Sequence, residues 1–123
     1  MKLTILGQIK SGKNNMRMTR TGKHYPNPEW AKWRNNVLDQ IKEQNIGQWE
    51  KFDAPCRVTV RYWKGDLRRR DVPGMIDALW HCFERSGIVS DDKWFEHVEW
   101  IPMGIDDNDN PRVEVEINLI PPF

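Results

Sequence analysis

The chain has 123 residues, of which 38% are hydrophobic and 30% charged, and its formal net charge is +1. This length supports one hydrophobic core, and no long linker or charge-rich tail divides it, so we expect a single domain over residues 1–123. No apolar run approaches the length of a membrane span and no signal-like segment follows Met1, which favours a soluble, cytoplasmic protein without a membrane partner.

The first segment of the chain is basic. Residues 3–9 are predicted to form a strand, and no Asp or Glu occurs before Glu29. The lysines and arginines of this segment are Lys2, Lys10, Lys13, Arg17, Arg20 and Lys23. Such a loop is suited to attracting phosphates, whereas the plainer interpretation is a solvated surface loop, and the sequence leaves both open.

Residues 7–14 nearly match the phosphate-loop pattern G-x-x-x-x-G-K-[ST]. The pattern fails at Asn14, which lacks the hydroxyl group that ligates Mg2+, and no helical pattern follows it. We therefore predict no nucleotide cofactor.

The rest of the chain predicts a mixed α/β scaffold of the α+β kind. A helix is expected after Asn27-Pro28 and before Gly47, because apolar residues recur at helical spacing between them. Alternating apolar residues predict strands over residues 56–62 and 113–119, and residues 94–101 are expected to form another. Together these elements predict a sheet of about four to five strands with two packed helices. Cys56 and Cys82 are expected to be buried and unpaired.

Residues 68–93, RRRDVPGMIDALWHCFERSGIVSDDK, carry the densest functional signal. Asp71 is a suitable N-cap, Pro73 fits the first turn, and Gly87 is placed for a left-handed C-cap, so a helix is predicted over about residues 72–86. Its apolar stripe is Val72, Met75, Ile76, Leu79, Trp80 and Phe83. Asp91 and Asp92 follow the helix after a tight reversal toward the sheet.

Carboxylates at both ends of this helix, beside three arginines, suggest metal-assisted chemistry on a phosphate backbone. Aspartate oxygens suit a hard ion such as Mg2+, and Arg68, Arg69 and Arg70 are placed to hold an anionic strand. The plainer interpretation makes Asp71 an N-cap only and the Asp91-Asp92 pair a turn. A capping aspartate can also offer an outer oxygen, so the two interpretations of Asp71 are compatible.

At these residues the sequence resembles the RusA family of Holliday junction resolvases, small endonucleases usually encoded by phages and prophages. The match consists of RRRD, a helix, and G-x-x-x-DD, preceded by a basic loop with the asparagine pair Asn14-Asn15. The resemblance implies a RusA-like α/β fold, a homodimer, Mg2+ dependence and cleavage of four-way DNA junctions in recombination and repair. It also implies a bacterial or phage-infected cell as the setting.

Carried over by position, Asp71 matches the family's first catalytic aspartate and Asp92 its late one, with Asp91 as the adjacent acid. The family typically reads D-x-D-N-x-x-K where this chain has Pro73 in place of the second aspartate and Asp77 in place of the lysine. Asp77 could restore the missing carboxylate, or could be a solvated helix residue paired with His81. A replacement lysine would have to come from Lys64, Lys13 or Lys93.

The resulting hypothesis is a dimeric, Mg2+-dependent junction endonuclease. Its candidate catalytic and metal ligands are Asp71, Asp77, Asp91 and Asp92. Its candidate DNA-binding residues are Lys13, Asn14, Asn15, Arg17, Arg20, Lys23, Lys64, Arg68, Arg69 and Arg70, with Trp63 as a possible base-stacking residue. The alternatives are a branched-DNA-binding protein that has lost cleavage, and a protein-interaction module using a tryptophan-rich surface.

Overall fold

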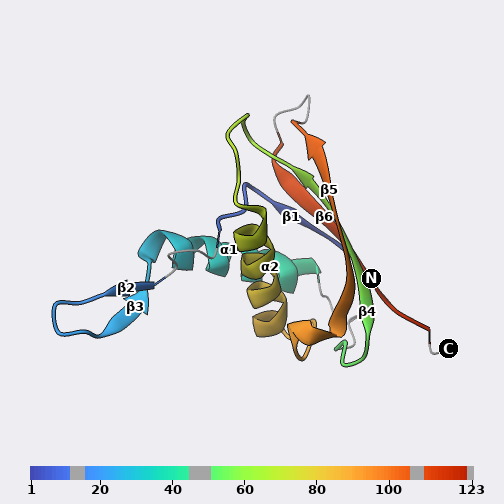
Figure 1. The fold of residues 1–123 in the computed structure, drawn as a ribbon, viewed down its shortest axis with the longest axis horizontal. Coiled ribbons are helices and arrows are strands. Elements are labelled where there is room, and N and C mark those ends of the chain that lie inside the picture. The colour runs from blue at the N-terminus through green and yellow to red at the C-terminus, as the bar shows by residue number, and fades with distance from the viewer. Residues whose placement is uncertain (12–15, 45–50, 106–109, 122–123) are drawn as a thin grey trace.

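The computed structural model describes residues 1–11, 16–44, 51–105 and 110–121, except that the side chains of Met16, Arg17 and Pro26 are not described. Four strands form one sheet in the order β1-β6-β4-β5. Their bounds are β1 Lys2–Leu6, β4 Cys56–Trp63, β5 Phe95–Gly104 and β6 Arg112–Leu119. Helices α1 (Pro28–Gln44) and α2 (Val72–Ser86) lie together on one face of this sheet (Figure 1). The prediction of an α+β fold with two helices on a four- to five-stranded sheet is confirmed.

The sheet is mixed. Strand β6 pairs antiparallel with both β1 and β4, whereas β4 and β5 run parallel. Parallel neighbours require a crossover connection, and α2 supplies it. Asp71 therefore lies at the end of the sheet where β4 finishes, and Asp91 lies at the opposite end, where β5 begins.

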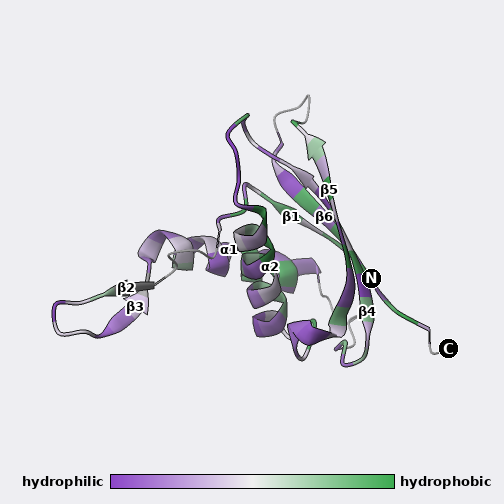
Figure 2. Cartoon of the chain, in the orientation of Figure 1, coloured by the Kyte–Doolittle hydropathy of each residue, from purple (hydrophilic) through white to green (hydrophobic). Residues whose placement is uncertain are grey.

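Helix α2 has the bounds that its local signals predicted. The Asp71 side chain caps its N-terminus, a proline occupies the first turn, and Gly87 adopts a left-handed conformation with φ of 83° at its C-terminus. Its inner surface is apolar and its outer surface polar (Figure 2).

The core lies between the helices and the sheet. Phe83, Trp80 and Phe95 form an aromatic group in which the Trp80 and Phe95 rings are 4.8 Å apart, edge to face. Cys56 and Cys82 are buried and unpaired, as expected. None of the helices in the described part of the chain is long and apolar enough to span a bilayer.

A two-stranded hairpin was missed by the sequence prediction, which treated this segment as a loop. Strands β2 (Met16–Met18) and β3 (His24–Pro26) pair antiparallel and extend away from the sheet beyond α1 (Figure 1). The turn is closed by Thr19, whose N–H donates to Lys23 O at 2.8 Å, and it contains Gly22 with φ of 86°. Strands of three residues are too short to show an alternating pattern.

Candidate nuclease site

The N-terminal end of α2 holds Asp71 in a fixed orientation. Its Oδ1 accepts a hydrogen bond from the Gly74 N–H at 3.4 Å, and its Oδ2 accepts one from Ser11 Oγ at 3.2 Å. Gly74 is needed here, because a Cβ atom at this position would overlap Ser11 Oγ and lie 2.5 Å from Asp71 Oδ2. The cap is thus joined to the loop that follows β1, while the Asp71 side chain remains exposed.

The same end of the sheet is tied together by Gln8. Its side chain donates to the Tyr62 hydroxyl at 2.7 Å and accepts from the Gly65 N–H at 2.9 Å. The loop after β1 is therefore attached both to the end of β4 and to the start of α2. This arrangement explains how a basic N-terminal segment comes to lie beside residues 68–71.

The three arginines before α2 have different environments. Arg70 forms an ion pair with Asp66, with 2.8 Å between Nη2 and Oδ1, and only 20% of its side chain is exposed. Arg68 and Arg69 are exposed. The pKa of Asp66 is lowered, first by the hydrogen bond from the Arg68 N–H and also by the charges of Arg70 and Arg68. Arg68 makes a longer ion pair with the same carboxylate, with 3.9 Å between Nε and Oδ2, but its side chain is 84% exposed. Arg70 is therefore held by Asp66, whereas Arg68 and Arg69 extend into solvent.

The remaining predicted DNA-binding residues are spread over two regions. Arg20 and Lys23 lie exposed in the turn of the β2–β3 hairpin, and Lys64 is half-buried directly after β4. The Trp63 ring next to it is covered by Arg112, whose Cζ lies 3.9 Å from the ring centroid. Lys13, Asn14 and Asn15 lie outside the described residues, and of Arg17 only the backbone is described.

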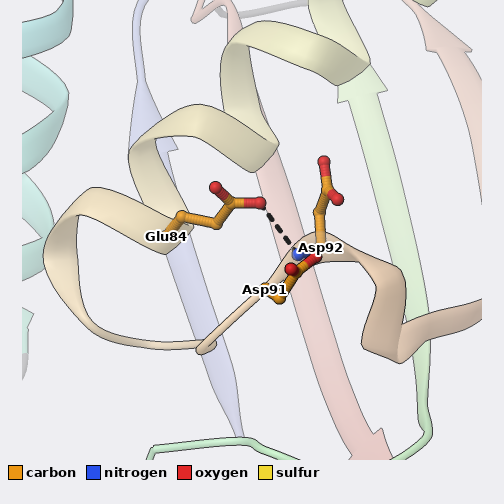
Figure 3. Close-up of side chains that lie close together, drawn as sticks. All are labelled: Glu84, Asp91 and Asp92. Carbon is orange, nitrogen blue, oxygen red and sulfur yellow. Dashed lines mark hydrogen bonds between the residues drawn. The ribbon is translucent and has the colours of Figure 1, made fainter.

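A group of three carboxylates lies at the other end of α2 (Figure 3). One oxygen from each of Glu84, Asp91 and Asp92 falls within 4.8 Å of the others, and all three residues are exposed. Glu84 Oε1 accepts a hydrogen bond from the Asp92 N–H at 2.8 Å, and Asp91 Oδ1 accepts one from the Lys93 N–H at 2.9 Å. Asp91 thereby caps the short 3-10 helix η1 (Asp92–Trp94) that leads into β5.

Glu84 was not among the predicted site residues. It lies in the last turn of α2, where the negative end of the helix dipole disfavours a carboxylate. A carboxylate at this unfavourable position was the signal by which Glu84 could have been identified from the sequence.

The electrostatics of this carboxylate group favour a bound cation. The pKa of Asp92 is raised, first by partial burial and then by the negative charges of Glu84 and Asp91. Oxygen donors from several carboxylates are also the ligands that Mg2+ and similar hard ions prefer. The residues present therefore fit a divalent cation.

Within one protomer, the predicted metal-binding residues do not all lie together. Asp71 and the Asp91-Asp92 pair lie beyond opposite ends of α2, whose 15 residues measure about 22 Å at 1.5 Å per residue. Asp77 is exposed on the same helix and, like Asp71, is outside the three-carboxylate group that the described residues form. His81, its expected partner, instead packs against Trp30, with ring centroids 5.3 Å apart.

Comparison with known proteins adds one curated relative. Over part of its length the chain is similar to a junction nuclease. The relative is the crossover junction endodeoxyribonuclease RusA of Aquifex aeolicus (strain VF5), which is 25% identical over 71 residues. The match covers 58% of this chain and 55% of the relative, so it spans about half the length of that protein. No family model matches the chain.

Proposed function

We propose that this protein is a Mg2+-dependent, structure-specific endonuclease that nicks four-way DNA junctions during recombination and repair. The observation that carries the proposal is the similarity to a crossover junction endodeoxyribonuclease, in a chain that has a carboxylate group suited to a divalent cation. Membership of the RusA family is part of the proposal.

In this proposal Glu84, Asp91 and Asp92 hold the cation. When bound, Mg2+ would neutralise developing charge on the phosphate and promote ionisation of water. Glu84 also fixes the position of Asp92, because Glu84 Oε1 accepts a hydrogen bond from the Asp92 N–H. Asp71 contributes a carboxylate whose orientation is fixed by Ser11 and Gly74.

The separation of Asp71 from Asp92 has a simple solution in a two-fold dimer. A dyad that places two α2 helices antiparallel brings the N-terminal end of one toward the C-terminal end of the other. Each complete site would then combine Asp71 of one protomer with Asp91 and Asp92 of the partner. Two such sites related by a dyad also suit a four-way junction, in which two symmetry-related strands are cut.

The basic surface is proposed to hold the DNA. It comprises Arg68 and Arg69 before α2 and Arg20 and Lys23 on the hairpin, all of them exposed. Arginine and lysine contacts to phosphates position the strand and make binding sensitive to salt. The projecting hairpin increases the length of duplex that one protomer can contact.

A second candidate function is favoured by Pro73 and Asp77. Pro73 has no metal-binding side chain, and Asp77 is exposed on α2 outside the carboxylate group. A protein with these two changes could bind branched DNA and leave it intact. This candidate shares the basic surface with the nuclease but requires no role for the carboxylates.

The first experiment incubates the protein with a labelled synthetic four-way junction, in Mg2+ or in EDTA, beside a linear duplex. The nuclease predicts paired nicks that require Mg2+ and disappear in both Asp71→Asn and Asp92→Asn. The binding protein predicts a salt-sensitive complex with the junction and no nicks in any condition. Asparagine retains capping ability at position 71, so the first variant tests charge while preserving the helix start.

Mixing the two variants tests the shared site. In a mixed dimer the Asp71→Asn protomer supplies an intact Asp92, and the Asp92→Asn protomer supplies an intact Asp71. In an equal mixture, random exchange of protomers makes half of the dimers mixed, and each mixed dimer has one complete site out of two. About a quarter of all sites should therefore be restored. If each protomer held a whole site, the mixture would remain inactive.

A further inference from the structure

The two edges of the sheet differ in their backbone hydrogen bonds. At the β1 edge, the Thr4 N–H donates to Gln44 Oε1 at 2.8 Å, and Gln44 Nε2 donates back to Thr4 O at 2.6 Å. Gln40 makes the same pair of bonds with Leu6, at 2.8 and 3.0 Å. Two glutamines of α1 thus occupy the places that a neighbouring strand would take, and this edge is closed to strand addition.

The β5 edge has no such protection. Strand β5 has 10 residues, and among the strands that the structure describes it pairs with β4 alone. In the described part of the chain, no group outside the sheet forms a hydrogen bond with the segment from Glu96 to Pro102. A long edge strand with free N–H and C=O groups is a template for pairing with another strand.

Apolar side chains line this edge on the side that faces the helices. Val98 lies opposite Val58 of β4 and Trp100 lies opposite Val60, so both point to the helix-covered side. Yet Val98 is 40% exposed and Trp100 is only partly buried. This strip would lose its contact with water if a further strand extended the sheet.

We propose that β5 pairs antiparallel with β5 of a second copy, which makes one continuous sheet of two protomers. The register follows from the side chains. A dyad at Val98 places Val98 opposite its own copy and places His97 opposite the partner's Glu99, twice by symmetry. Shifting the dyad to Glu99 would set two glutamates face to face, and shifting it to His97 would set two histidines face to face, so Val98 is the favoured centre.

This register also places the proline of β5 outside the centre of the interface. Pro102 lacks an N–H group and would interrupt the ladder wherever it paired. With the dyad at Val98 it pairs opposite the partner's Trp94, at the end of the interface. The central hydrogen bonds are therefore complete.

The interface connects to the candidate site, and this step rests on the proposed function. In antiparallel pairing the dyad is perpendicular to the sheet, so both α2 helices stay on the same face and run in opposite directions. Asp92 lies three residues before β5 begins at Phe95, so it would lie toward the end of the partner's sheet that carries Asp71.

Crosslinking tests the register directly. Cβ atoms of directly opposed residues in an antiparallel pair lie about 4.5–5.5 Å apart, which is close to the separation needed for a disulfide. Under mild oxidation Val98→Cys should form a covalent dimer in high yield. Leu6→Cys is the matched control, because Leu6 is 54% exposed on the closed edge and should stay monomeric on a non-reducing gel. The native Cys56 and Cys82 are buried and should not interfere.

A second experiment introduces charge at the interface and measures dimerisation by analytical ultracentrifugation of the full chain. His97→Glu creates two Glu-Glu contacts and should weaken the dimer by about tenfold, since each cross-strand pair then brings two like charges together. The double variant His97→Glu with Glu99→Lys places opposite charges across the interface and should recover the dimer.

The results separate this proposal from the nuclease. A wild-type monomer, or a dimer that Val98→Cys does not crosslink and His97→Glu does not weaken, would overturn the β5 interface. A dimer with all the expected responses but no junction cleavage would support the interface and count against the nuclease.

Discussion

Ser11 Oγ donates a hydrogen bond to Asp71 Oδ2 at 3.2 Å, although 60 positions separate the two residues. The contact attaches the loop after β1 to the N-cap of α2. The cap therefore depends on tertiary structure as well as on its own sequence. It is possible only because Gly74, in the first turn, has no side chain.

Gly74→Ala should destabilise the protein. In an ordinary exposed helix this change is favourable by about 1 kcal/mol, but here the added methyl group would overlap Ser11 and crowd Asp71. We expect a net loss of about 1–3 kcal/mol in urea unfolding, as is typical of overpacking. Adding Ser11→Ala removes one of the two clashes and should recover part of the loss. A Gly74→Ala variant as stable as the wild type would show that the Ser11 and Asp71 side chains move aside at little cost.

Removing Glu84 should weaken cation binding. A ligand present at 100 times its dissociation constant stabilises the folded state by about 2.7 kcal/mol, so Mg2+ should raise the melting temperature. Glu84→Gln retains an acceptor for the Asp92 N–H but loses the charge, and most of the Mg2+-dependent rise should disappear. Asp39→Asn is the matched control, since Asp39 is an exposed acid of α1. Equal Mg2+ responses in all three proteins would argue against a cation at Glu84.

Neutralising Asp92 should stabilise the metal-free protein at neutral pH. Because its pKa is raised in the folded chain, this carboxyl favours folding most below its ordinary value of 3.8. That contribution is lost as the pH rises through the raised pKa. In EDTA, Asp92→Asn should therefore gain stability at pH 7 and gain nothing near pH 3. The side chain is exposed, so solvent screening limits the gain to below about 1 kcal/mol. A gain of the same size at both pH values would contradict this explanation.

The glutamines of α1 should contribute to stability through β1. Gln40→Ala removes both hydrogen bonds to Leu6 and should cost about 1–2 kcal/mol in urea unfolding. Gln40→Glu keeps the acceptor and loses the donor, so it should cost about half as much at neutral pH. Light scattering should show new self-association in the double variant of Gln40→Ala and Gln44→Ala, because its edge is open. A double variant that is as stable as the wild type and associates no further than the wild type would mean that the two glutamines neither stabilise this edge nor close it.

The buried thiols should be inert in the folded protein. Burial raises the pKa of Cys82 to about 12 and also raises the pKa of Cys56, so the reactive thiolate is scarce in both. A thiol reagent at pH 8 should label neither cysteine in buffer and both in denaturing urea. Rapid labelling in buffer would indicate local opening of α2 or β4.

The extents of α2, β4 and β6 could be predicted from local sequence, whereas the first strand ends at Leu6 and not at residue 9 as expected. Helix α2 begins and ends where Asp71, Pro73 and Gly87 predict, because capping and backbone conformation are set by residues within one turn. Strands β4 and β6 follow the alternation of apolar residues, which depends only on the two-residue period of a strand. The hairpin β2–β3 escaped prediction because its strands are too short for such a period.

The candidate site, like the fold, could be predicted from the sequence only in part. The sequence alone predicted Asp71, Asp91, Asp92 and the arginines before α2 as candidates, since their chemical types suit a cation and a phosphate, but it did not predict Glu84. Only the tertiary structure decided which of them meet. The parallel pairing of β4 and β5 sends α2 across the sheet, so Asp71 and Asp92 lie about a helix length apart and Glu84 joins the late pair. Strand pairing forms between residues far apart in the chain, and for that reason no local pattern specifies it.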